Sequence, residues 1–185
     1  FESAGISALL KDHRLDIGCF EAVNTLFETE SPEILIHLAA QSLVKASFKD
    51  PLATLQTNVM GTANVLQAAR GCHSLKTILV ISTDKVYKTS GGEKAFSEVD
   101  TLGGADPYSV SKACAEIVSE SYYQAYFRKT DKKLFVFRSG NVIGGGDWAA
   151  DRLIPDLVAS LKSKAILKLR NPRAVRPWQH VLEPL

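Results

Sequence analysis

The chain has 185 residues, with 22 lysines and arginines against 20 aspartates and glutamates, and a formal net charge of +2 at pH 7. Hydrophobic residues make up 45% and charged residues 23%, which is enough apolar material for a core and excludes wholesale disorder. The small net charge gives no strong field for nucleic acid or an anionic membrane, and the length predicts one domain or part of one.

Cysteine use and the absence of long apolar runs favour a cytosolic protein. The three cysteines, Cys19, Cys72 and Cys114, are odd in number, far apart and without zinc-site spacing. No apolar run approaches the ~20 residues that span a bilayer, and the first residues lack a signal-peptide pattern. We therefore expect a cytoplasmic chain with no metal site and no membrane partner. Because it begins with Phe1, we expect a processed protein or part of a longer one.

Short apolar runs alternate along the chain with segments of helical period. The predicted elements, in order, are a helix at 19–30, a strand at 33–40, a helix at 51–70, a strand at 77–82, a helix at 107–128, a strand at 134–138, a helix at 150–162 and a strand at 165–170. The strands are continuously apolar, as strands covered on both faces are. The pattern predicts an α/β fold, a Rossmann-like parallel sheet with helices on both faces.

Ligands of such sheets bind beyond the carboxyl ends of the strands, so the segments that follow the strands are the places to look for chemistry. One pair of side chains lies at the start of the 107–128 helix, which Asp106 and Pro107 mark as N-cap and first helical residue. In YSVSK (108–112), Tyr108 and Lys112 are four residues apart and share a helix face. A nearby ammonium stabilises a phenolate, which makes the pair a candidate proton acceptor for an alcohol. Taken alone, the pair is also compatible with an ordinary surface contact.

The sequence STDK (82–85) directly follows the strand at 77–82. A hydroxyl at Thr83 can bond a reacting oxygen, and a carboxyl at Asp84 can pass a proton to a leaving hydroxide. The alternative is a polar strand end at which Asp84 caps a turn. Taken alone, the motif does not decide between the two.

The combination of motifs is far more specific than either part. A strand ending in ISTDKVY and followed by PYSVSK at a helix start resembles the extended short-chain dehydrogenase/reductase family. HLAA, NVMGTANVLQAA and RSGNVIG match the same family, over residues 34 to 146. The resemblance implies NAD as cofactor and makes Thr83, Tyr108 and Lys112 the catalytic trio. It also nominates cofactor contacts at Asp16, Ile17, Leu38, Ala39, Ala40, Thr57, Tyr108 and Lys112.

Within the family, Asp84 resembles the acid of the nucleotide-sugar 4,6-dehydratases. Two long segments, GNVIGGGDWAADRLIPD and RNPRAVRPWQHVLEPL, resemble the dehydratases that act on CDP-glucose. By that resemblance a nucleotide sugar of the CDP-glucose type is the substrate, contacted by Asn141, Arg152, Leu153 and Arg176. Surface ion pairs remain the alternative for the two arginines. Lys85 occupies the position where other dehydratases carry a glutamate base, so either Lys85 or another group removes the proton at sugar carbon 5.

The resemblance also sets expectations for the organisation of the chain. We expect a partial NAD-binding domain at 1–164 and the beginning of the substrate-binding region at 165–185. The first βα unit with its glycine-rich loop and most of the substrate lobe are expected to lie outside the chain, so that this span alone binds NAD weakly or not at all. Similar enzymes form homodimers through two long helices, which predicts pairing through 51–70 and 107–128. A 4-epimerase, another dehydratase and a non-catalytic dinucleotide-binding module are the alternative functions.

Overall fold

The computed structural model describes residues 5–88, 95–169 and 171–184. The chain divides into two compact units, Arg14–Arg138 and a second unit made of Phe1–His13 with Ser139–Leu185. In the described part of the chain, no helix is long and apolar enough to cross a bilayer. The expected division at residue 164 concerns cofactor and substrate binding and stays a prediction.

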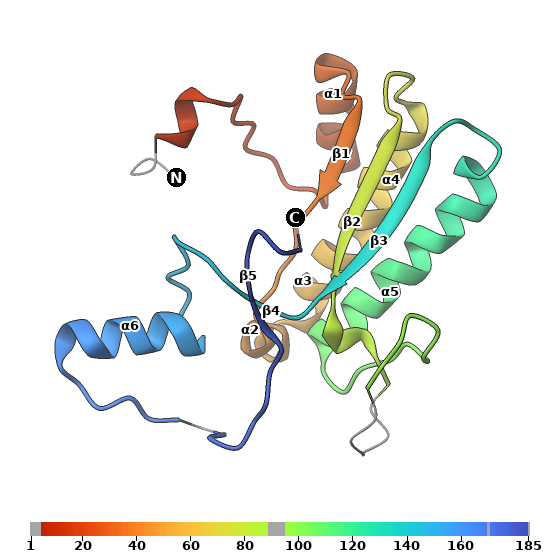
Figure 1. The fold of residues 1–185 in the computed structure, drawn as a ribbon. Helices are drawn as coiled ribbons and strands as arrows, with labels where there is room; N and C mark the ends of the chain where they lie inside the picture. Colours follow the sequence, from red (N-terminus) through yellow and green to blue (C-terminus); the bar gives the residue numbers. More distant parts are fainter. Residues whose placement is uncertain (1–4, 89–94, 170, 185) are drawn as a thin grey trace. The chain divides into compact units, whose positions relative to one another are not determined.

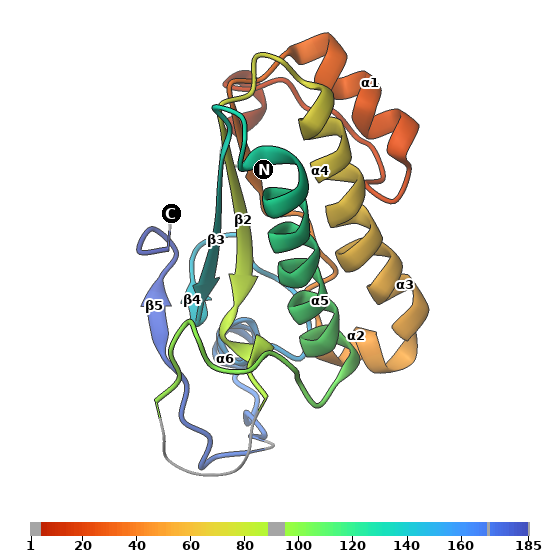
Figure 2. The ribbon, with the colours of Figure 1, turned by 90° about the vertical axis from the view of Figure 1, so that its right-hand side faces the viewer.

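The first unit is built on a parallel sheet. Its strands are β1 (Ile34–His37), β2 (Thr77–Thr83) and β3 (Lys133–Ser139), in the order β1-β2-β3. Ile34 pairs with Thr77 and His37 with Val80 in parallel register. The three arrows point the same way in Figure 1, so the strand ends that are expected to carry chemistry share one edge. The predicted parallel α/β fold is confirmed, with β1 shorter than the predicted 33–40. Helices were expected on both faces of the sheet, whereas the described helices of this unit lie on one face (Figure 2).

The helices of this unit cover one face of the sheet, as Figure 2 shows. They are α1 (Phe20–Glu30), α2 (Val44–Lys49), α3 (Pro51–Leu55), α4 (Gly61–Gly71) and α5 (Pro107–Tyr122). Leu66, Ile78, Val80 and Phe127 belong to the core between the helices and the sheet. On the opposite face of the sheet, Phe135 and Phe137 remain 45% and 47% exposed, because successive strand residues alternate between faces.

Local sequence explains where the helices begin. Asp50 and Asp106 each accept a backbone N–H three residues ahead, from Ala53 and Ser109, and each is followed by a proline at the first helical position. The predicted helix at 51–70 contains a π-helical segment, Gln56–Met60, and the one at 107–128 ends in another, Tyr123–Phe127. A propensity pattern does not distinguish these segments from α-helix.

In the second unit, β4 (Asn141–Ile143) pairs in parallel with β5 (Trp178–His180). The predicted helix at 150–162 is confirmed as α6 (Leu153–Ser163), which begins three residues later. The predicted strand at 165–170 is wrong: residues 165–169 form no strand, and residue 170 lies outside the described residues. Ile166 is 90% exposed, so this apolar run has neither the pairing partner nor the packing that stabilises a strand.

Candidate active site

The turn that follows β2 gathers the first set of candidate residues. The Thr83 hydroxyl donates to Asp84 Oδ1 at 3.2 Å, and its oxygen accepts the Lys85 backbone N–H at 3.4 Å. Lys85 Nζ lies 3.4 Å from the same Asp84 oxygen, so the carboxylate is held between a hydroxyl and an ammonium. Asp84 and Lys85 are about one-third exposed, which leaves this carboxylate accessible to a ligand.

The start of α5 carries the second set. Tyr108 and Lys112 are 8% and 7% exposed and lie one turn apart on the face that packs toward the sheet. Lys112 Nζ donates to the carbonyl of Ile81 at 2.8 Å, two residues before Thr83. This bond links α5 to the strand end that carries Thr83, Asp84 and Lys85.

Burial perturbs the ammonium of Lys112. Removal from water lowers the pKa of Lys112, and the nearby carboxylate of Glu116 opposes that shift. Among the described residues, Ile81 is the one hydrogen-bond acceptor of Lys112 Nζ, which has three N–H donors. The remaining donors suit the vicinal hydroxyls of a ribose, so the residues present fit the sugar of a dinucleotide.

The other candidate cofactor residues come from three segments: the stretch before α1, the loop after β1 and the π-helical segment after α3. Leu38 is 57% exposed, and with Ala39 and Ala40 it directly follows β1. Asp16 Oδ1 accepts the Gly18 N–H at 2.8 Å, and Thr57 lies half-buried in the π-helical segment after α3.

Ile17 is held against α4. Its carbonyl accepts from Asn64 Nδ2 at 2.9 Å, and a Cβ at Gly61 would meet the Ile17 side chain at 2.6 Å. The glycine therefore permits the close approach of residues 15–17 to the helix.

A buried polar network is centred on Asn58 and was not predicted from the sequence. The Asn58 side chain exchanges two hydrogen bonds with the backbone of Gln41, at 2.8 and 3.0 Å, and donates to Ser111 Oγ at 2.8 Å. Ser111 in turn donates to the carbonyl of Tyr108 at 2.7 Å. Asn58 thus joins the loop after β1 to the helix of Tyr108. The signal in the sequence is that Asn58, a polar residue, shares a face of the predicted helix at 51–70 with the apolar Val65, seven residues later.

A second missed cluster contains Glu116 and Arg138. Arg138 Nη2 donates to Glu116 Oε2 at 2.7 Å, and the two side chains are only 16% and 8% exposed. The hydrogen bonds to this carboxylate hold the pKa of Arg138 far above its usual range. The spacing of Glu116, four residues after Lys112 on the buried face of α5, is the signal in the sequence.

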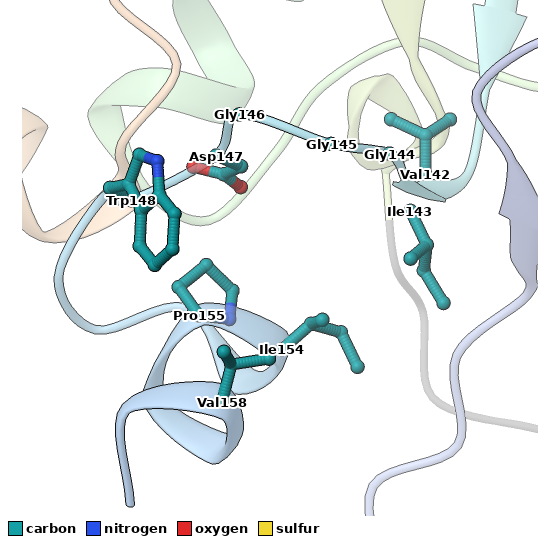
Figure 3. A pocket seen from close by; sticks show the side chains of 10 residues that line it. All are labelled: Val142, Ile143, Gly144, Gly145, Gly146, Asp147, Trp148, Ile154, Pro155 and Val158. Atoms are coloured by element: carbon teal, nitrogen blue, oxygen red, sulfur yellow. The ribbon is translucent and has the colours of Figure 1, made fainter. Parts of the chain in front are cut away.

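The candidate substrate residues all belong to the second unit. Figure 3 shows a pocket of about 210 Å³ in this unit, between the glycine loop at 144–146 and α6. Arg152 is the N-cap residue of α6, directly before Leu153, and it donates to Asp147 Oδ2 at 3.0 Å. In the described part of the chain, the buried Oδ1 of Asn141 has no hydrogen-bond partner. Arg176 is exposed and bonds the carbonyl of Val175.

The described residues were compared with the pattern of side chains that hold metal ions. Over residues 5–88, 95–169 and 171–184, no three His, Cys, Asp or Glu side chains come together as metal ligands do. Within the same ranges the cysteines Cys19, Cys72 and Cys114 are free.

Comparison with known proteins gives consistent matches. Residues 3–184 match the GDP-mannose 4,6 dehydratase family. The CDP-glucose 4,6-dehydratase of Salmonella typhimurium is 41% identical over 190 residues, which cover 100% of this chain and 53% of that protein. The human dTDP-D-glucose 4,6-dehydratase is 36% identical over 142 residues, covering 76% of this chain and 38% of that protein.

A solved structure resembles the fold closely. The dTDP-glucose 4,6-dehydratase of Streptomyces venezuelae, solved with NAD bound, superposes with a TM-score of 0.82 at 27% identity, over 96% of this chain and 54% of that one. The chain therefore spans about half the length of the Salmonella and Streptomyces proteins.

Proposed function

This chain belongs to the GDP-mannose 4,6 dehydratase family, and on that premise we propose that the intact protein is an NAD-dependent nucleotide-sugar 4,6-dehydratase that converts CDP-D-glucose to CDP-4-dehydro-6-deoxy-D-glucose and water. The observation that carries the proposal is the position of Asp84. Its carboxylate lies in a turn between Thr83 and Lys85, and that turn contacts the helix that bears Tyr108 and Lys112. An acid at this place suits the elimination of a hydroxyl group.

The proposed mechanism assigns one proton transfer to each group. Tyr108 takes the proton of the sugar 4-hydroxyl, with Thr83 bonding the same oxygen and the Lys112 ammonium stabilising the phenolate. Bound NAD would supply the redox chemistry, accepting hydride from carbon 4 and returning it to carbon 6. Once carbon 4 is a ketone, the proton on carbon 5 is acidic. Neutral Lys85 or another base removes it while protonated Asp84 gives its proton to the 6-hydroxyl, which leaves as water. The base returns a proton to carbon 5 when hydride is added to carbon 6.

Asp16, Ile17, Leu38, Ala39, Ala40 and Thr57 are the proposed cofactor contacts beside Tyr108 and Lys112. The proposal is supported by the small or exposed side chains after β1 and by the free N–H donors of Lys112 among the described residues. For the nucleotide sugar, Asn141, Arg152, Leu153 and Arg176 are the proposed contacts. A guanidinium bonds a pyrophosphate in bidentate fashion, and the partnerless Asn141 oxygen offers an acceptor to a hydroxyl.

The choice of CDP-glucose is tested by a substrate panel. The intact protein, supplied with NAD, is incubated with CDP-, UDP-, GDP- and dTDP-glucose, and the alkaline absorbance of a 4-keto-6-deoxy product is followed. Product from CDP-glucose alone supports the proposal. Product from only one of the other nucleotide sugars would show that this sugar, and not CDP-glucose, is the substrate. No product from any of them, despite bound NAD, favours the 4-epimerase or the non-catalytic module.

We further propose that the intact protein is a homodimer through the helices at 51–70 and 107–128. Support comes from the outward surface of α3 and α5, where Leu52 and Ile117 are 77% and 58% exposed. Monomeric proteins rarely leave a large contiguous apolar patch in water. A second copy of the same surface would cover it in a two-fold arrangement.

A further inference from the structure

One face of α5 buries three titratable side chains in succession. Tyr108, Lys112 and Glu116 are spaced four residues apart and are 8%, 7% and 7% exposed. Two of them carry full charges. Burial of a charge is costly unless the group is paired and hydrogen-bonded, so the partners of Lys112 and Glu116 decide how this face is built.

Glu116 is paired with residues of both neighbouring strands and not with Lys112. Its Oε1 accepts from the Ser82 hydroxyl and from Arg138 Nε, and its Oε2 accepts from Arg138 Nε at 3.0 Å and from Nη2 at 2.7 Å. Ser82 is the residue before Thr83, and Lys112 bonds the carbonyl of Ile81 just before that. The Glu116 carboxylate therefore fixes the end of β2 to α5 at Ser82. The next residues, Thr83, Asp84 and Lys85, form what we call the catalytic turn.

Arg138 also contacts Tyr87, which lies on the other side of the turn from Ser82. The guanidinium carbon lies 4.8 Å from the centroid of the Tyr87 ring, and Tyr87 directly follows the turn at Asp84–Val86. Arg138 Nη1 also donates to the carbonyl of Glu98 at 3.3 Å. One ion pair thus contacts residues on both sides of Thr83, Asp84 and Lys85.

We propose that Glu116 and Arg138 form a positioning pair, which holds the catalytic turn on both sides and balances the charge beside Lys112 and Tyr108. Neither residue is assigned a chemical step. The inference rests on the proposed function in one respect, since it takes Tyr108 and Lys112 to be the proton-transfer pair.

The electrostatic part follows from the charges around Lys112. The titratable groups around it include Tyr108 and Glu116 on α5, His37 on β1, Asp84 and Lys85 after β2, and Arg138 on β3. The helix α2, which also packs against α5, adds Lys45 and Lys49. The carboxylate of Glu116 raises the pKa of Lys112, whereas an unpaired guanidinium at Arg138 would lower it. Neutralising Glu116 therefore makes the local charge one unit more positive, and neutralising Arg138 makes it one unit more negative.

The test compares Glu116→Gln, Arg138→Gln and the double variant in the intact protein. For each, the phenolate absorbance of Tyr108 is titrated as the difference between the protein and its Tyr108→Phe counterpart, which cancels the other tyrosines. We expect the Tyr108 midpoint to move down by about 0.5–1 pH unit in Glu116→Gln and up by a similar amount in Arg138→Gln. The double variant is expected to return close to the starting midpoint.

Opposite shifts separate this role from simple structural support, because loss of packing would disturb both single variants in one direction. Shifts of the same sign, or no shift in either variant, overturn the proposal. Glu120→Gln is the matched control, since Glu120 is exposed on the next turn of α5 and is expected to leave the midpoint unchanged.

If one single variant fails to fold, the other single variant should still shift the Tyr108 midpoint, and the double variant should still return it close to the starting value. The proposal is overturned if that shift or that return is not observed. The readout needs neither substrate nor turnover. An inactive protein that shows the opposite shifts would therefore contradict the proposed function, while the charge balance that Glu116 and Arg138 provide beside Tyr108 would remain supported.

Discussion

At the scale of single residues, Asp84 is the group on which dehydration is expected to depend. Asp84→Asn removes the proton donor for the 6-hydroxyl and leaves Thr83, Tyr108 and Lys112 in place. We expect formation of the 4-keto-6-deoxy product to fall about 10²–10⁴-fold while slow NADH formation persists. The product and NADH absorbances are measured in parallel, with the exposed Asp131→Asn as control; dehydration near the parent rate would mean that Asp84 is not the acid.

A second prediction at this scale concerns His37 and the pH dependence of the free energy of unfolding. Thr62 Oγ1 donates its one hydrogen to the Asn58 carbonyl at 2.6 Å, so His37 Nε2, 3.0 Å away, is the donor to Thr62. Burial, with a smaller contribution from Lys112, lowers the pKa of His37 from 6.5 to about 4. Between those two values the unfolded chain binds a proton that the folded chain does not.

The free energy of unfolding should therefore fall as the pH drops from 6.5 to about 4, by about 2–3 kcal/mol from this group, and the contribution should level off below that. Urea unfolding at several pH values measures it. In His37→Gln the pH dependence over this window should be smaller by that amount. An unchanged pH dependence in the variant would show that His37 is not held neutral.

Some site residues can be recognised from the sequence because they are close along the chain. Thr83, Asp84 and Lys85 are consecutive, and Tyr108 and Lys112 are one helical turn apart, so proximity within each of these two sets follows from local geometry alone. Asn58 bonds Ser111 across 53 positions and Glu116 bonds Arg138 across 22, and such pairings are fixed only when the elements pack. The roles assigned to Asn141, Arg152, Leu153 and Arg176 stay predictions.

At the scale of elements, caps and apolar periodicity were sufficient to predict the main helices and three of the strands. They failed where packing decides. The π-helical Gln56–Met60 has the same composition pattern as its α-helical neighbours, and the run at 165–169 is apolar enough for a strand but pairs with none in the described residues. The short α2 was missed because it spans only Val44–Lys49 and has no side-chain cap.

Lys132 supports an element-scale prediction, because its ammonium caps the carboxyl end of α4. Nζ donates to the carbonyls of Ala69 and Cys72, both at 2.6 Å, and of Arg70 at 3.2 Å. Lys132→Met leaves these carbonyls without their charged donor, and we expect the free energy of unfolding to fall by about 1–2 kcal/mol in urea titration. The exposed Lys129→Met serves as control, with a change within about 0.5 kcal/mol. Equal stability of both variants would rule out the cap.

At the scale of the whole molecule, the proposed homodimer depends on the outward surface of α3 and α5. A groove of about 520 Å³ runs along it, lined by Leu52, Ala53, Leu55, Gln56, Val59, Met60 and Cys114. On α5, Ile117 lies three residues after Cys114 and is 58% exposed, on the same side of the helix. Water contact over so much apolar area is unfavourable, by roughly 25 cal/mol per Å², and a second copy would remove it.

Ile117→Glu tests the dimer. In a two-fold interface the substitution places two carboxylates among apolar side chains, one from each copy, and neither has a buried partner. We expect sedimentation velocity to give a dimer for the parent protein and a monomer for Ile117→Glu at micromolar concentration. Val99→Glu is the control: Val99 is 93% exposed in the segment between β2 and α5, so this variant should remain dimeric. A monomeric parent, or a dimer that survives Ile117→Glu unchanged, would show that this surface does not join two copies.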